Sequence, residues 1–410
     1  MFRCFFGFLI FFSLVRAVTL DEVLGLALAN TYQLEEKWHL LEAARLEKKS
    51  LYALFGPRLN ASYTASLNIP QNRASYGQQA FNLTGQLNIF NGMQDFYSYK
   101  KAGVALNLEE SFLDSTKNDL ILSTKLAYIQ ILQLKESIKI AKESIRLLET
   151  QLYDTNQFFI YGISDKSALL SIEIKLANAK IDLARLQGAL TQNLNLLKKL
   201  SGQIFSEDSI EDIDVPEQIA YDKEELLKQI YENNPQFRAK ALLSLQQQHE
   251  RKIRQGFYYP SISLNAQYWH TIGGSSSIPQ TQQSRIQFQV TWNLSDIYTA
   301  FYRDSSARAR LLALEASKAD LRSDREGEVA SLLNNLELAK QKLIVSKVSL
   351  EQAQENYRIV SNRYQENIVN YIELLNAELM LTNAKSEIIT SRYEIASNVA
   401  KIDHLKNEGF

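Results

Sequence analysis

The stretch "RIQFQVTWNL", from Arg285 to Leu294, alternates strictly between two kinds of side chain. Its apolar positions are Ile286, Phe288, Val290, Trp292 and Leu294, and its polar positions are Gln287, Gln289, Thr291 and Asn293. Because successive side chains of a strand point to opposite faces, this alternation predicts a half-buried β-strand. The polar face carries only neutral amides and hydroxyls, whereas a strand of a soluble sheet usually exposes Lys or Glu to water.

Three other segments repeat this charge-free alternation, namely "LNASYTASLNI" at 59–69, "FNLTGQLNI" at 81–89 and "SISLNAQY" at 261–268. Each spans about ten residues, the length that a tilted strand needs to cross the hydrocarbon of a bilayer. Such strands are typical of a transmembrane barrel with lipid outside and water inside. An ordinary β-hairpin domain packed on an apolar partner is the alternative. An aromatic girdle is expected near the strand ends, from Tyr258, Tyr259, Trp269 and Trp292.

The first residues, "MFRCFFGFLIFFSLVRA" at 1–17, have the composition of a secretory signal peptide. Arg3 supplies a short basic region, an apolar run follows, and Val15-Arg16-Ala17 forms the expected cleavage site. An uncleaved N-terminal anchor is the alternative. Cleavage would remove Cys4, the only cysteine, so the mature chain could form no disulfide and no cysteine metal site. Export together with barrel strands predicts a protein of the bacterial outer membrane.

The composition and the scattered histidines argue against several classes of function. With 45 basic and 46 acidic residues the chain is nearly neutral, so we expect no nucleic-acid partner. The four histidines, His39, His249, His270 and His404, lack the spacing of metal ligands. No Ser/His/Asp constellation is suggested by spacing. We therefore expect no enzyme, no catalytic residue, no cofactor and no metal site.

The sequence contains an internal duplication. The segment that begins "LDEVLGLALAN" aligns with the one that begins "KEELLKQIYEN", which pairs Leu24 with Leu227 at an offset of 203. Further on, the tripeptide Asn-Ala-Lys at 178–180 recurs at 383–385, an offset of 205. Each repeat should contain an amphipathic helix, two strands and a long helical stretch. The predicted boundaries are a first repeat at 18–202, an acidic linker at 203–220 and a second repeat at 221–410.

Proline is absent from Gln71 to Val215 and from Gln280 to Phe410, which permits long helices. Apolar residues recur there at alternating spacings of three and four, a period near 3.5 that is typical of a coiled-coil seam. The seams run through Ala127, Ile131, Leu134, Ile138, Ala141, Ile145, Leu148 and Leu152, through Leu169, Ile172, Leu176, Ala179, Leu183, Leu186 and Leu190, and through Leu332, Leu336, Ala339, Leu343, Ser346, Leu350, Ala353, Tyr357 and Val360. At 1.5 Å per residue the first helical arm would be about 90 Å long.

One break interrupts each helical stretch, at matching places in the two repeats. The first is "FFIYGISD", where Gly162 can adopt the left-handed conformation that ends a helix. The second is "RYQENIVN", where Asn367 lies 205 residues after Gly162. Asn is the non-glycine residue that best tolerates this conformation. Each stretch is therefore predicted to be a helical hairpin with its tip at the break.

Four strands cannot close a barrel, because known barrels begin near eight strands. Two copies would give a barrel filled by side chains, whereas three copies would give twelve strands and a wet lumen. The neutral polar faces would line that lumen and the apolar faces would meet lipid. A periplasmic coiled-coil adaptor or scaffold would explain the helical seams but not the strands. A simple diffusion porin would explain the strands but not the long helices.

In the order of its parts the chain resembles the outer-membrane efflux protein family, the TolC-like proteins, from Thr19 to about Leu405. The resemblance rests on the duplicated order, on "NPQFRAKA" at 234–241, on the "GP" and "YYP" turns before the first strand of each pair, and on the two tips. It implies a homotrimer with a 12-strand transmembrane β-barrel and a 12-helix periplasmic tunnel. It also implies the exit duct of a tripartite efflux or type I secretion system. The implied partners are a periplasmic adaptor (membrane fusion protein) and an inner-membrane transporter of the RND or ABC type.

The resemblance also implies which residues act in transport. Adaptor contacts are expected at the two tips, from Gly162, Ile163 and Ser164 and from Asn367, Ile368 and Val369. The family often has two acidic residues, three apart, that face the pore after the second tip. Here these positions are Glu373 and Asn376, so a cation-selective constriction would keep one acidic ring and should be weak. The alternative for Glu373 is a solvated carboxylate on the helix surface.

Overall fold

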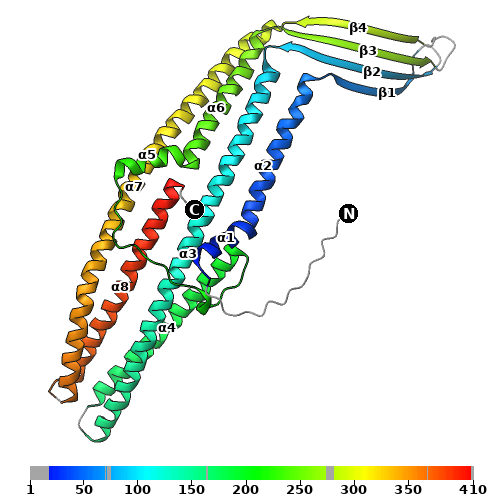
Figure 1. Ribbon diagram of the computed structural model, residues 1–410. Coiled ribbons are helices and arrows are strands. Elements are labelled where there is room, and N and C mark those ends of the chain that lie inside the picture. The colour runs from blue at the N-terminus through cyan, green and yellow to red at the C-terminus, as the bar shows by residue number, and fades with distance from the viewer. Residues whose placement is uncertain are drawn as a thin grey trace. The chain divides into compact units, whose positions relative to one another are not determined.

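The computed structural model describes residues 18–69, 71, 75–162, 165–273, 281–366 and 368–407. These residues are mostly helical and include one four-stranded antiparallel sheet (Figure 1). The chain divides into two compact units. Unit 1 comprises Met1–Leu34, Thr116–Asn234 and Asp324–Phe410, and unit 2 comprises Glu35–Ser115 and Pro235–Ser323 and holds the sheet. The predicted signal peptide at 1–17 lies outside the described residues.

The elements follow one order in each half of the chain. The first half has α1 (Leu20–Asn30), α2 (Tyr32–Ser50), η1 (Leu51–Phe55), β1 (Arg58–Asn68), β2 (Tyr76–Asn91), α3 (Gln94–Ile160) and α4 (Lys166–Ser201). A short helix, η2 (Glu207–Ser209), follows. The second half has α5 (Lys223–Asn233), α6 (Pro235–Gln255), η3 (Gly256–Tyr258), β3 (Ser261–Gly273), β4 (Thr281–Thr291), α7 (Leu294–Gln365) and α8 (Tyr371–Lys406).

The single amphipathic helix expected at the start of each half is in fact a pair of helices. In the first half the break is at Thr31, whose hydroxyl donates to the carbonyl oxygen of Leu200 at 2.7 Å. In the second half the break is at Asn234, because the following Pro235 disfavours a helical conformation in the residue before it. The prediction of one helix was therefore wrong in both halves. Pro235 marks the second break in the sequence, whereas at the first break Thr31 contacts a distant segment.

The four predicted strands are present and pair in the order β1-β2-β3-β4, so that β2 and β3 join the two halves of the chain. The opening stretch is shorter as a strand than expected, since β4 ends at Thr291. Leu294 instead begins α7, whose first turn carries Asp296. An acidic side chain in the first turn favours a helix, because it faces the positive end of the helix dipole.

The pairing register keeps the two kinds of side chain on separate faces of the sheet. Across β3 and β4, Leu264 pairs with Phe288 and Ile262 pairs with Val290, so apolar side chains form continuous rows. Phe288 is 63 % exposed, which leaves this apolar face uncovered within the chain. On the other face amides contact one another, as where the Asn265 side chain donates to that of Gln289 at 3.4 Å.

Two details of the sheet differ from the sequence prediction. A register shift between Asn88 and Phe90 leaves Ile89 out of the pairing, and Phe90 takes its place opposite Ile262. The consecutive apolar residues Ile89 and Phe90 interrupt the alternation, but the sequence alone does not say which of the two is left out of the pairing. Trp269 pairs with Asn82 and so lies on the polar face, where the guanidinium of Arg285 lies 5.3 Å from its ring. Trp269 therefore lies on the face opposite the apolar rows.

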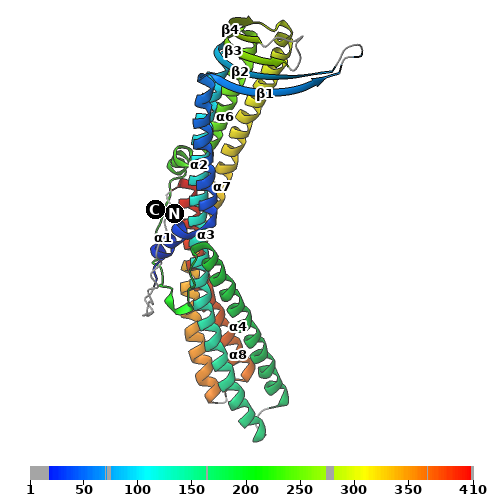
Figure 2. The same ribbon diagram turned by 90° about the vertical axis from the view of Figure 1, so that its right-hand side faces the viewer.

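The predicted coiled-coil seams form the core of unit 1. Ile131, Ile138 and Leu336 are each at most 2 % exposed. The α3–α4 and α7–α8 hairpins reach the same end of this unit, as both views show (Figures 1 and 2). Among the described helices, none combines the length and the apolar character that crossing a bilayer would need.

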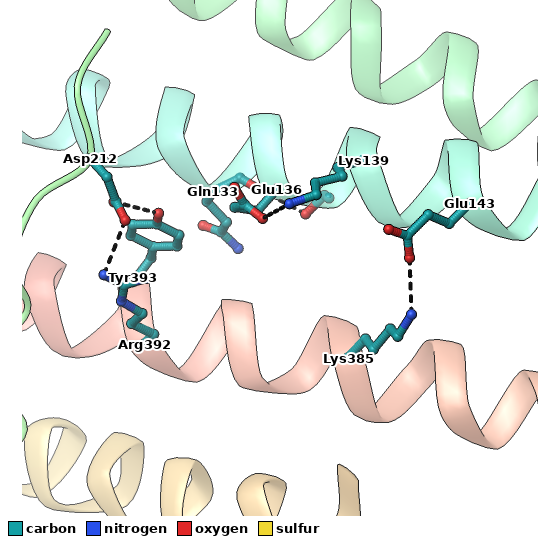
Figure 3. A network of polar contacts seen from close by, with 9 residues as sticks. Gln133, Glu136, Lys139, Glu143, Asp212, Lys385, Arg392 and Tyr393 are labelled. Atoms are coloured by element: carbon teal, nitrogen blue, oxygen red, sulfur yellow. Dashed lines mark hydrogen bonds and ion pairs between the residues drawn. The ribbon is translucent and has the colours of Figure 1, made fainter. Parts of the chain in front are cut away.

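The acidic segment at 203–220, which we expected to be a linker, packs closely on the helices of unit 1. We call this segment the strap. Its apolar side chains Phe205, Ile210 and Val215 are buried. The carbonyl oxygen of Ile210 accepts a hydrogen bond from Lys135 of α3 at 3.0 Å. Figure 3 shows Asp212 accepting hydrogen bonds from Tyr393 and Arg392 of α8, at 3.0 and 3.2 Å. The strap is thus fixed to two helices from different hairpins.

Candidate functional site

The first hairpin turns between Ile160 and Lys166. Gly162 is exposed and has a φ of 74°, which confirms the predicted left-handed conformation. Its N–H donates to the carbonyl oxygen of Phe159 at 3.0 Å, as expected at the end of a helix. A Cβ at this position would meet no atom within 4 Å, so only the backbone conformation restricts substitution. Ile163 and Ser164 lie outside the described residues.

The second hairpin turns between Gln365 and Tyr371. Asn367, which we expected in the left-handed conformation, lies outside the described residues. Ile368 donates its N–H to the carbonyl oxygen of Arg363 at 2.9 Å, and its side chain is 60 % exposed. Val369 is half-buried. The second tip therefore presents one large apolar side chain to its surroundings.

Both tips are followed by a capped helix, a feature that the sequence prediction missed. Asp165 precedes α4, and its side chain accepts the N–H of Ala168 at 2.8 Å. Asn370 precedes α8, and its side chain accepts the N–H of Glu373 at 3.0 Å. Asp and Asn are among the strongest N-cap residues, so the signal was present in the sequence. The caps fix where each tip ends and each helix begins.

An apolar cluster holds the two hairpins together just behind the tips. Its buried members come from three helices and are Ile145, Leu148, Ile172, Leu176, Tyr371 and Leu375. The rings of Tyr364 and Tyr371 lie 6.4 Å apart and connect α7 to this cluster. The tips of unit 1 are therefore positioned by a shared core rather than by their own short turns.

A surface hollow of about 700 Å³ lies between the two tips. Residues from both hairpins line it, among them Asp165, Ser167 and Lys175 from one and Val369, Asn370 and Ile372 from the other. It offers charged, polar and apolar groups at the same place. Such a hollow can receive protruding side chains from another molecule, as recognition sites of mixed character do.

Glu373 and Asn376 are both exposed and lie three residues apart on α8, so they are neighbours on one helix surface. Glu373 also lies in the first turn of α8, where the helix dipole favours a carboxylate. The four histidines belong to α2, α6, β3 and α8. Within the described residues, no group of three or more His, Cys, Asp or Glu side chains could hold a metal ion.

The family model described as outer membrane efflux protein matches residues 23–203 and 226–407. Among curated protein sequences no significant match was found. The fold is similar to that of the outer membrane protein VceC from Vibrio cholerae, with a TM-score of 0.80 and 16 % identity over 95 % of this chain and 96 % of that one.

Two further channels have the same fold. The CmeC outer membrane channel of Campylobacter jejuni gives a TM-score of 0.81 at 16 % identity, covering 95 % of this chain and 86 % of that one. The open state of the MtrE outer membrane channel of Neisseria gonorrhoeae gives 0.79 at 17 % identity, covering 96 % and 93 %. At such identities the likeness shows the fold alone. The family model, however, covers most of the sequence in two matching halves. The chain therefore belongs to the outer membrane efflux protein family, and it is an efflux duct of the outer membrane rather than an enzyme.

Proposed function

We propose that three copies of the chain assemble into one duct with a 12-strand β-barrel and a 12-helix periplasmic tunnel. Within the described residues β1 and β4 each pair with a neighbour on one side only. Closing such a sheet needs strands from other copies, and eight strands would leave no open lumen. The exposed apolar rows of the sheet would then face lipid, and the amide-lined face would enclose water.

The proposed role is the last stage of a tripartite efflux or type I secretion system. In this role the tips receive a periplasmic adaptor, and an inner-membrane transporter of the RND or ABC type supplies the substrate. The observation that carries this proposal is the hollow of about 700 Å³, which both hairpin tips line. Gly162, Ile163, Ser164, Asn367, Ile368 and Val369 are the proposed contact residues.

Two further assignments belong to the same proposal. Residues 1–17 act as a signal peptide, and the mature chain consists of two repeats at 18–202 and 221–410 joined by the strap. Glu373 forms a ring of three carboxylates around the axis of the trimer, beside a neutral ring from Asn376. Such a ring would favour cations at low ionic strength and lose this preference as salt screens it.

Adaptor docking can be tested with a photo-crosslinking amino acid at single positions. At Ile368, which is 60 % exposed at the tip, we expect a crosslink to a periplasmic membrane fusion protein in native membranes. Ile181, which is 66 % exposed on α4 well beyond the tip, serves as the control and should give no such product. Equal products at both positions, or none at Ile368, would contradict docking at the tips.

A further inference from the structure

Glu378 of α8 is the one acidic side chain that is buried among the described residues, at 3 % exposed. Its counterpart in the first hairpin, Glu173, lies 205 residues earlier in the sequence and is exposed on α4. The matching position alone therefore does not explain the burial. Glu378 faces α3, where Gln151 is itself only 6 % exposed.

Gln151 and Glu378 share one hydrogen bond and leave two oxygens without a partner. The side-chain nitrogen of Gln151 donates to Oε2 of Glu378 at 2.8 Å. The remaining oxygen of each group, Oε1 of Gln151 and Oε1 of Glu378, is buried and has no hydrogen-bond partner. Two acceptors cannot satisfy each other, but a single proton placed on the carboxyl would provide the missing donor.

The surrounding groups offer little compensation for a negative charge. The charge of Lys175 on α4 acts on Glu378, but no ion pair joins these two described residues. Lys175 is itself half-buried, and this burial lowers the pKa of its ammonium. α7 and α8 contribute the phenols of Tyr357 and Tyr371, and Asp182 and Arg185 of α4 line the same hollow of about 570 Å³ as Glu378.

We propose that Glu378 holds a proton and forms a two-hydrogen-bond acid–amide pair with Gln151, and that release of this proton loosens α8 from α3. In the protonated pair the Oε1–H of Glu378 donates to Oε1 of Gln151, while the amide of Gln151 donates to Oε2. When the proton leaves for solvent, the two buried Oε1 atoms are left without a donor. The pair is therefore a pH-sensitive latch close behind the tips.

Burial favours the protonated, neutral form of Glu378, and this sets the direction in which pH changes the latch. Burial raises the pKa of Glu378 above its ordinary value, against smaller opposing effects of the Gln151 hydrogen bond and the Lys175 charge. Between the ordinary carboxyl pKa and the raised one, the folded chain binds a proton that the opened chain has released. The latch is thus complete below the ordinary value and is lost as pH rises through the raised value.

A second contact between α3 and α8 depends on pH in the opposite direction. Lys385 of α8 donates to the carboxylate of Glu143 on α3 at 2.9 Å, at the surface of unit 1 (Figure 3). The hydrogen bond from Lys385 lowers the pKa of Glu143. Glu143 therefore stays ionised as pH rises, and this contact persists. Loss of the latch would therefore loosen α8 locally, around Glu378, rather than separate the two helices along their length.

The protonation state can be read directly by infrared spectroscopy of the mature protein in detergent. A protonated carboxyl has a carbonyl stretch that a carboxylate lacks. As the pH is raised, we expect one such band to persist after the exposed carboxyls have lost theirs, in the wild type and in Glu173→Gln but not in the isosteric variant Glu378→Gln. If no band in the wild-type spectrum outlasts those of the exposed carboxyls, or if such a band is retained in Glu378→Gln, the proposal is overturned.

Hydrogen exchange of the backbone around residues 374–385 tests the consequence for the helices. After correction for intrinsic exchange, the opening of this segment should increase by up to about tenfold per pH unit across the window in the wild type and in Glu173→Gln. In Glu378→Gln the opening should not depend on pH, because an amide can pair with Gln151 at every pH. An equal pH profile in the wild type and Glu378→Gln would contradict the latch even if the infrared band were present.

Discussion

Asp165 and Asn370 lie 205 residues apart and cap the first turns of α4 and α8 in the same way, since each side-chain oxygen accepts the backbone N–H three residues later. The two hairpins therefore leave their tips in the same way although their tip sequences differ. This relationship places the tips on capped, regular helices.

Replacing Asp165 with Ala should destabilise the first turn of α4 by about 1 kcal/mol, because one helix N–H loses its acceptor. Hydrogen exchange of residues 166–169 would measure this as faster local opening. Asp165→Asn is the control, since Asn caps as well as Asp and should leave exchange nearly unchanged. Equal exchange in the two variants would show that the cap has no role in fixing the tip.

Gly162→Val should strain the first tip by about 1–2 kcal/mol, since an L-residue with a branched Cβ resists a φ of 74°. Adaptor crosslinking from Ile368 and local exchange at the tip would report the change, while assembly should be unaffected. Gly188→Val is the control, because Gly188 also has no atom within 4 Å of an added Cβ but lies inside helix α4. If both variants behave like the wild type, the left-handed turn does not constrain the tip.

The two faces of β4 should respond differently to a charge. Val290→Arg should impair membrane assembly, since an arginine on the lipid face near the midplane costs about 2–4 kcal/mol. Gln289→Arg, one residue away on the amide-lined face, should assemble and mainly alter conductance. Assembly can be followed by outer-membrane fractionation and by resistance to proteolysis. A similar loss in both variants would contradict the assignment of the faces.

The strands and the hairpins could be predicted from the sequence because their signals are local. The alternation in β4, the heptad seams and Gly162 each depend on neighbouring residues only. The break at Thr31, the residue left out of the pairing at Ile89 and the pairing of Glu378 with Gln151 could not be predicted in this way. They depend on Leu200, on the register of β3 and on Gln151, which are distant in the sequence.

The burial of Glu378 could have been predicted from the sequence. Tyr371, Leu374 and Glu378 follow the spacing of three and four that marks a seam, so the phase of α8 places a carboxyl among buried positions. Its partner could still not be found, because nothing in the local pattern selects Gln151. The strap was likewise identified by its acidic composition, whereas its buried Ile210 and its bond to Lys135 emerge only from packing.

Two arginine–carboxylate pairs, Arg251–Asp304 and Arg358–Glu355, have similar hydrogen-bond geometry but should contribute differently to stability. Arg251 of α6 donates to both oxygens of Asp304 on α7, at 2.8 and 3.2 Å, and the Asp304 side chain is 19 % exposed. Hydrogen bonds from Arg251, supported by Gln255, hold the pKa of Asp304 below its ordinary value. Asp304→Asn should therefore lower the stability at pH 7 by about 1–2 kcal/mol, after discounting for partial exposure.

The pH dependence of this pair has the opposite sign to that of Glu378. Stability from Asp304 is present above its ordinary pKa and is lost as pH falls through its lowered value, so the wild type and Asp304→Asn should converge in acid. Thermal unfolding in detergent at neutral and acidic pH measures this. Glu355→Gln, which breaks the exposed pair with Arg358, is the control and should change little. A larger effect from Glu355→Gln would contradict the account.

Native mass spectrometry of the mature chain in detergent tests the central claim most directly. The single chain presents four strands with an uncovered apolar face, and only the assembly of copies can enclose its amide-lined face around a wet lumen. We predict a stable trimer that persists on dilution and dissociates only when the detergent no longer protects the sheet. A stable monomer or dimer as the largest species would contradict the trimeric duct.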